Sequence, residues 1–297
     1  MLGAMISRNI KLYFKDKGMF FTSLITPMIL LVLYVTFLGG TFADSFESAM
    51  PEGFSVTEGV IDAAVGAQLM ASLLSVCCVT VAFCCNMISV QDKVNGAAAD
   101  IFVSPAKSFM ISAGYYIASL ISSLIVCFAA FGACLIYINS VGWFMSGRDI
   151  LLLSADILLT VMFGTALSSL VNVFLNSQGQ ISAVGTVVSA GYGFVCGAYM
   201  PISQFGDGLQ KLLSFMPSTY SASLFKSHAL RGVLEQMSMD GVPDEIITEI
   251  KKVMDCTVTF GGKTVSTASM YIFVAAAALA AVLIYAALSA AAERKCR

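Results

Sequence analysis

Residues 63–91 read AAVGAQLMASLLSVCCVTVAFCCNMISVQ and contain no charged side chain. A helix needs about 20 mostly apolar residues to cross the hydrocarbon core of a bilayer, so this stretch predicts a transmembrane helix near residues 64–89. Asp62 stands just before the stretch and Asp92 just after it, which places both ends of the span. The same criterion can be applied outward along the chain.

Other stretches with few or no charges also meet this length criterion. The longest of them, residues 157–206, is too long for one helix, and the polar segment 176–180 divides it. We therefore predict an all-α polytopic membrane protein with about six transmembrane helices in a single domain, residues 1–297. The expected spans lie near residues 19–40, 64–89, 109–138, 150–174, 181–199 and 267–291.

The composition supports a membrane protein and excludes two other classes. Of the 297 residues, 58% are hydrophobic and only 11% are charged, whereas a soluble domain carries roughly 25% charged residues. A water-facing surface therefore cannot be built from this chain. The net charge of -2 argues against nucleic-acid binding, which requires a basic patch.

We predict no catalytic residue, no metal and no cofactor on this chain. The one histidine, His228, has no serine or cysteine at a recognisable catalytic spacing. Residues 261–264 read GGKT like the end of a phosphate-binding loop, but Thr257 stands where its first glycine is required. Most of the nine cysteines lie in apolar runs, which is typical of buried hydrophobic residues.

The distribution of basic residues predicts the orientation. Loops on the cytoplasmic side are enriched in lysine and arginine. Basic residues gather before the first span, in the loop after the second span and in the C-terminal tail, whereas the first outer loop is acidic. We therefore expect both termini to be cytoplasmic, in the inner membrane of a bacterium. Residues 200–266 are expected to form a re-entrant and extracytoplasmic segment.

Residues 4–17, before the first span, have the pattern of an amphipathic helix. Apolar residues at helical spacing share one face, and basic residues share another. Such a helix lies in the membrane interface, with its bases toward anionic lipid. The alternative is a basic flank that only sets the topology. The apolar face comprises Ile6, Ile10, Tyr13 and Phe14, and the basic face comprises Arg8, Lys11 and Lys15.

The inner loop, residues 91–106, is longer than a simple turn. It has room for a short helix that Pro105 would end. A cytoplasmic helix between two spans can dock a partner protein. The residues that we expect at this surface are Asp92, Lys93, Gly96, Asp100 and Pro105.

Small and polar residues recur every fourth position in the fourth span. Asp156 is the only carboxylate inside a predicted span, and such residues are candidates for function. Each i+4 step overshoots a helical turn by about 40°, so the stripe follows either a crossing neighbour or a twisting cavity wall. The candidate path residues are Asp156, Thr160, Ser168, Asn172 and Asn176, with Gly164 between them.

The fifth span carries a ridge of small residues at every fourth position: Gly185, Ser189, Gly193 and Gly197. Such ridges let helix backbones approach closely in membranes. The contact can lie within one bundle or between two subunits, and we favour the subunit interface.

The segment that follows the fifth span resembles a signature of the ABC type-2 transporter permeases. Two further features agree with the resemblance: the basic N-terminal helix and the loop from Asp92 to Pro105. The family often has another proline before the Leu-Gln pair, and residues 206–208 stand there instead. The resembling positions are Gly197, Pro201, Leu209, Gln210, Pro217, Thr219, Tyr220 and Arg231.

This resemblance implies a permease subunit without catalytic activity. Two permease subunits, alike or paralogous, would pair around a substrate path. A separate ATPase subunit, which would bind ATP and Mg, would dock on the inner loop and drive export. The apolar spans favour a hydrophobic or amphipathic cargo, such as a drug, a lipid-like molecule or an antimicrobial peptide. The alternative is a membrane receptor or scaffold that transports nothing.

Overall fold

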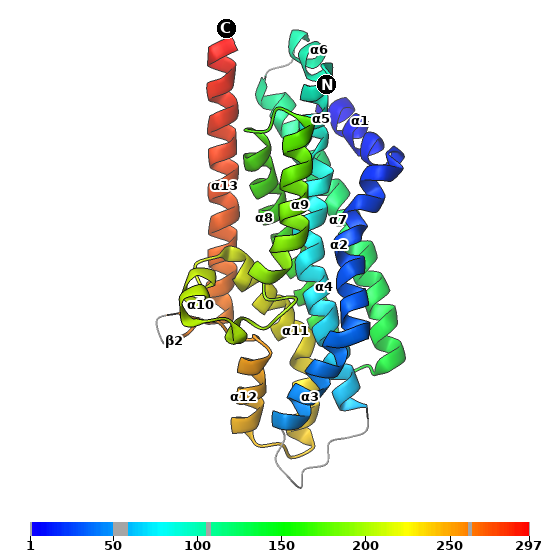
Figure 1. The fold of residues 1–297 in the computed structure, drawn as a ribbon, viewed down its shortest axis with the longest axis vertical. Coiled ribbons are helices and arrows are strands. Elements are labelled where there is room, and N and C mark those ends of the chain that lie inside the picture. The colour runs from blue at the N-terminus through cyan, green and yellow to red at the C-terminus, as the bar shows by residue number, and fades with distance from the viewer. Residues whose placement is uncertain (1, 50–58, 105–107, 261–262, 297) are drawn as a thin grey trace.

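The fold is an elongated bundle of helices, seen in a computed structural model that describes residues 2–49, 59–104, 108–260 and 263–296. Figure 1 shows both termini at one end of the bundle, beside α1, α5 and α6; we call this the terminal end, and the opposite end, at α3 and α12, the distal end. The elements are α1 (Leu2–Lys15), α2 (Lys17–Leu33), the π-helical η1 (Tyr34–Leu38), α3 (Gly39–Ala49), α4 (Val60–Asn86), α5 (Ile88–Val94), α6 (Ala97–Val103), α7 (Ser108–Val141), α8 (Gly147–Asn172), α9 (Gln178–Val195), the 3₁₀ helix η2 (Ile202–Gln204), α10 (Asp207–Leu213), α11 (Pro217–Met239), α12 (Asp244–Val253), β1 (Thr259–Phe260), β2 (Lys263–Thr264) and α13 (Thr267–Cys296).

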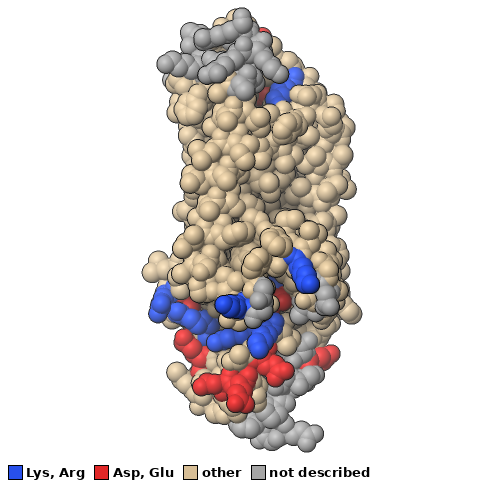
Figure 2. Space-filling view, turned by 90° about the vertical axis from the view of Figure 1, so that its left-hand side faces the viewer, with Lys and Arg blue, Asp and Glu red and all other residues tan. Residues whose placement is uncertain are grey.

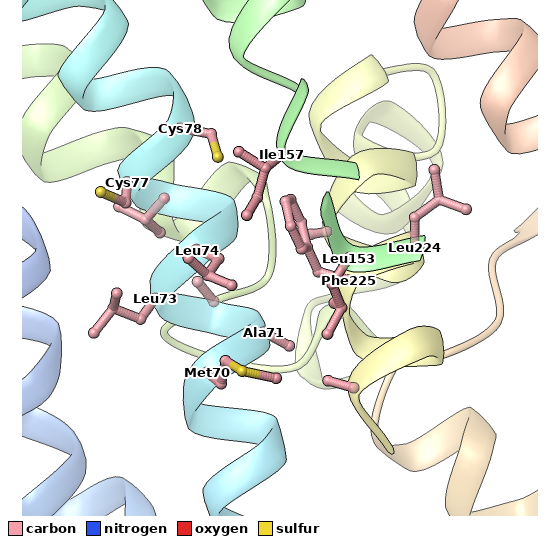
Figure 3. Close-up of a cluster of buried hydrophobic side chains, with 14 of the residues drawn as sticks. Met70, Ala71, Leu73, Leu74, Cys77, Cys78, Leu153, Ile157, Leu224 and Phe225 are labelled. Carbon is pink, nitrogen blue, oxygen red and sulfur yellow. The ribbon is translucent and has the colours of Figure 1, made fainter. Parts of the chain in front are cut away.

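Helix α4 forms the centre of the bundle, and α2, α7, α8, α9 and α11 pack against it. Figure 3 shows Leu74 of α4 among side chains that include Ile157 of α8 and Phe225 of α11. A Cβ atom on Gly164 would lie 3.1 Å from the backbone of Val79, so this glycine lets α8 approach α4 closely. Apolar surface buried around α4 therefore holds the bundle together.

The predicted all-α membrane architecture is confirmed, but the number of spans differs from six. Four helices of the described chain are long and apolar enough to cross a membrane, and a bent pair, α1 with α2, makes a fifth. The four are residues 60–94, 109–141, 147–172 and 267–290. Helix α9 is not among them, because its 18 residues include the polar start Gln178-Gly179-Gln180 and are not apolar enough.

Helix α1 turns away from α2 by 71°. The bend falls at Asp16, whose carboxylate accepts the Met19 N–H at 3.1 Å and so caps the start of α2. The face of α1 that is buried against the bundle contains Asn9 and Tyr13, whereas Phe14 is exposed. The buried face is therefore rotated from the predicted apolar face, because α7 rather than lipid alone covers this helix.

The segment 200–266 is packed more deeply than its charges indicate. Helix α11 contacts α4, α8 and α13 inside the bundle, and most of its side chains are buried. The expectation of a re-entrant and extracytoplasmic segment remains a prediction. Charge spacing misleads here because α11 carries Lys226, His228 and Arg231, and each of these side chains has an acidic partner within the chain.

Candidate functional site

A long groove runs between α2 and α9, and Cys84 of α4 is also in its lining. Its volume is about 1190 Å³. One wall carries Ile25, Ile29 and Leu33 of α2, and the other carries Ile181 and Phe194 of α9. Asp16 is the only charged residue in the described lining, and it lies at the terminal end of the groove. The groove therefore suits an apolar or amphipathic molecule.

The small-residue ridge at α9 packs against residues of the same subunit. Added Cβ atoms on Gly185 and Gly197 would lie 3.0 Å from Met87 and 2.8 Å from Ile202, and one on Gly193 would overlap the ring of Tyr199. Gly185 and Ser189 also line the groove. Three of the four ridge residues thus serve packing within the subunit. A role for the ridge in a subunit interface remains a prediction.

The polar series of α8 is buried against α4 rather than exposed in the groove. Asn86 Nδ2 donates to Ser168 Oγ at 3.0 Å, and Asn172 Nδ2 donates to the Asn86 carbonyl at 2.8 Å. Thr160 is buried as well, whereas Asn176 is exposed after the helix has ended. No residue of the series is among the described residues that line the groove. Its role in a translocation path therefore remains a prediction.

Asp156 stands at the centre of a buried polar cluster. Its Oδ2 shares a 2.6 Å hydrogen bond with His228 Nδ1 of α11, and its Oδ1 accepts the hydroxyl hydrogen of Tyr271 of α13. The carboxylate is fully buried. The cluster joins three helices. The sequence pattern identified Asp156 as a candidate. It could not identify His228 and Tyr271 as its partners, because they lie 72 and 115 residues further along the chain.

At the terminal end, hydrogen bonds to Asp92 connect α5 with α1 and α7. Arg8 donates two hydrogen bonds to its carboxylate, at 2.7 and 3.0 Å, and the Tyr115 hydroxyl donates a third at 2.6 Å. The hydrogen bond with Asp92 raises the pKa of Arg8. Arg8, which we expected to face lipid headgroups, is therefore a partner of Asp92.

The predicted docking loop consists of α5 and α6, and its residues divide into two groups. Asp92 is buried, and the Lys93 ammonium donates to the carbonyl of Asn172 at 2.9 Å, at the end of α8. Gly96 adopts φ +81° between the two helices, and Asp100 is exposed on α6. Pro105 lies outside the described residues. Helix α6 therefore carries exposed residues of the loop, among them Val103, which is 88% exposed.

The signature residues hold the turn between α9 and α11. Gln210 Nε2 donates to the carbonyl of Phe205 at 2.6 Å. Thr219 and Tyr220 donate their hydroxyl hydrogens to carbonyls at the end of α10, Leu213 and Ser214, at 2.8 and 2.7 Å. These bonds satisfy carbonyls that the short helix leaves free. Pro201 precedes η2, and Pro217 begins α11, where its missing N–H costs nothing.

Arg231, the last signature residue, binds the start of α8. Its Nε lies 2.6 Å from Asp149 Oδ1, and its Nη2 donates to Ser146 Oγ at 3.0 Å. Ser146 and Asp149 also form the capping box of α8. Beside Arg231, a Cβ atom on Gly232 would overlap the carbonyl oxygen of Phe144. Helix α11 is therefore held tightly against the α7–α8 connection.

A second buried ion pair was not expected from the sequence. Lys226 Nζ donates to the carbonyl of Gly197 at 2.9 Å and to Asp255 Oδ2 at 3.3 Å. The same carboxylate oxygen accepts the Ile202 N–H at 2.7 Å. Gly197 has φ +70°, which favours glycine. This network joins α11 to the turn after α9 and to the segment after α12.

Comparisons with known proteins give one family. A family model described as ABC-2 type transporter matches residues 2–228, which cover three quarters of the chain. The match ends inside α11 and includes the groove, α6 and most of the signature positions. A comparison with curated proteins gives no significant match.

Proposed function

This chain belongs to the ABC-2 type transporter family, and from this premise we propose that it is the membrane-spanning subunit of an ATP-driven exporter. As a permease component of an ABC transporter it is not itself the enzyme. ATP and Mg would bind a separate ATPase subunit.

The groove between α2 and α9 is the observation that supports this proposal best. Its lining is mostly apolar and is drawn mainly from α2, η1, α3 and α9. A second permease subunit, a copy or a paralogue, would cover the groove and complete the path. A hydrophobic or amphipathic cargo, such as a drug, a lipid-like molecule or an antimicrobial peptide, matches the walls.

The exposed helix α6 supports coupling at the terminal end, which would face the bacterial cytoplasm. Asp100 and Val103 offer an acidic and an apolar contact there. Asp92 and Lys93 would act indirectly, since they fix α5 to α1 and α8. A movement of α6 would thereby reach α1 and α8, which directly precede the two groove helices, α2 and α9.

The test is co-purification from the native membrane, followed by transport in vesicles. An exporter subunit should be recovered with an ATPase chain, and apolar cargo should stimulate its ATP hydrolysis. Ile29→Trp should abolish that stimulation, because the larger side chain narrows the groove. Ile284→Trp on α13 is the matched control, because Ile29 and Ile284 are 50% and 49% exposed. Recovery of the chain with no ATPase would favour the receptor or scaffold instead.

A further inference from the structure

A second pocket, beside the turn between α9 and α11, has a different chemistry from the groove. Its volume is about 580 Å³, which is within the range of ligand sites, about 300–1,000 Å³. It lies between α10, α11 and the segment that follows α12. Three lysines line it: Lys211, Lys226 and Lys252. Ile202 of η2 also lines it, while the neighbouring Pro201 and Gln204 line the groove.

The charges in this pocket do not cancel. Asp255 is the only acidic residue in its described lining, and it is paired with Lys226. Lys211 and Lys252 are exposed, and no ion pair within the described part of the chain involves either of them. Two positive charges are therefore available to a ligand.

The pocket also offers hydrogen-bond donors. The Lys226 side chain is only 2% exposed, and its ammonium has three donors, of which two are used by Gly197 and Asp255. Thr257 lines the pocket, and its buried hydroxyl has no hydrogen-bond partner among the described residues. An anion with several oxygen atoms would accept hydrogen bonds from both.

Apolar side chains stand beside the pocket and face outward. Leu209, Leu212 and Phe215 of the α10 region are between 44% and 63% exposed, and Phe260 of β1 is 44% exposed. The rings of Phe215 and Phe260 meet edge to face at 5.1 Å. An exposed apolar patch next to lysines is typical of a membrane interface.

Figure 2 shows the same boundary on the side of the bundle that carries α10 and β2. Basic side chains form a band there, between a long uncharged surface and the acidic distal end. The exposed lysines of α10, α12 and β2 are Lys211, Lys251, Lys252 and Lys263, and the acidic residues of α12 are Asp244, Glu245 and Glu249. The band lies where headgroups would meet the protein.

We propose that this pocket binds the phosphate of an anionic amphiphile, with its headgroup on Lys211, Lys252 and Lys226 and its chains along Leu212, Phe215 and Phe260. The bilayer leaflet at the distal end would supply the ligand. The site is distinct from the groove, and its binding requires neither ATP hydrolysis nor transport. A negative result here would leave the proposed exporter function untouched, and the reverse also holds.

The test measures lipid binding to the purified full chain in neutral detergent by native mass spectrometry. The probes are phosphatidylglycerol, phosphatidylcholine and inorganic phosphate. Phosphatidylglycerol should bind in preference to phosphatidylcholine. Lys211→Gln with Lys252→Gln should weaken phosphatidylglycerol binding about tenfold or more. Lys251→Gln with Lys263→Gln makes the same charge change on the same face, outside the pocket lining, and should weaken it less than about threefold.

Competition by inorganic phosphate separates the two sources of this anion. Displacement of the lipid by phosphate would show that the anion alone fills the pocket. Retention of the lipid would show that the chain contacts are also needed. Either result supports the site, provided that the pocket variant loses binding and the control does not. Equal binding of the two lipids, or equal losses in both double variants, would overturn the proposal.

Discussion

The two ends of the bundle are held together in different ways. At the distal end, the side chains of Lys226 and His228 are 2% and 8% exposed, and each is paired with a buried aspartate. At the terminal end, Arg8 is 37% exposed and pairs with Asp92 from the protein surface. Loss of its partner costs a buried charge much more free energy than an exposed charge, which water can solvate. We therefore expect the distal pairs to contribute more to stability than the pair at the terminal end, where contacts can change at a lower cost.

The largest effect is expected at Asp255. Asp255→Ala would leave the Lys226 ammonium buried with only the Gly197 carbonyl as partner, and this should destabilise the protein by about 3–5 kcal/mol. Unfolding of the purified chain in a denaturing detergent measures the loss. Asp244→Ala on exposed α12 is the control, with an expected change within about 0.5 kcal/mol. Equal stability of the two variants would mean that the distal pair does not hold this end.

The next effect is expected at Asp156. Asp156→Ala removes the acceptor of both His228 and Tyr271, and each unsatisfied buried group costs about 1–3 kcal/mol. Because Tyr271 is only half-buried, we expect a total loss of about 2–4 kcal/mol in the same unfolding assay. Asp156→Asn keeps one acceptor oxygen and should lose less than Asp156→Ala. If the two variants lose the same amount, the hydrogen bonds in this cluster contribute little.

A smaller effect is expected at Asp92. Asp92→Ala frees the guanidinium of Arg8, but water can solvate it, so the loss should be only about 1–2 kcal/mol. Release of α1 should make Lys11 and Lys15 more sensitive to trypsin in vesicles that expose the terminal end. Tyr115→Phe removes one of the three bonds and should give an intermediate rate. A loss as large as that of Asp255→Ala would contradict the contrast between the two ends.

The smallest effect on stability is expected on α6. Asp100→Lys with Val103→Ser changes only exposed side chains, so stability should stay within about 0.5 kcal/mol. Association with the ATPase chain should nevertheless fall about tenfold, since one charge contact and one apolar contact are lost. Co-purification yields compared with those of the wild type measure it. Unchanged yields would show that the docking surface lies elsewhere.

The gaps between charged residues predict the four long apolar helices of the described chain. The helices at 60–86, 108–141, 147–172 and 267–296 begin and end within about five residues of the expected spans. This succeeds because the bilayer sets both the length and the polarity of a spanning helix.

Helix α11 could not be predicted in this way. Lys226, His228 and Arg231 are typical of an exposed loop when only the local sequence is considered. Their acidic partners lie 29, 72 and 82 residues away in the sequence, respectively. The same limitation applies to Asp92, which resembles a docking residue but is satisfied by Arg8 and Tyr115. Local patterns predict which residues are polar, whereas only the packed bundle shows which of them are already satisfied.

The contact between Tyr271 and Asp156 also determines when the buried cluster can be completed during synthesis of the chain. Asp156 is synthesised 115 residues before Tyr271, and a ribosome adding roughly 5–20 residues per second needs roughly 6–23 seconds to cover that distance. His228 is synthesised 72 residues after Asp156, and from then until Tyr271 is made the nascent chain lacks the hydroxyl that completes the cluster. Insertion of the last helix therefore finishes the distal end, and a chain interrupted before residue 267 would present an incompletely paired carboxylate to the quality-control proteases of the membrane.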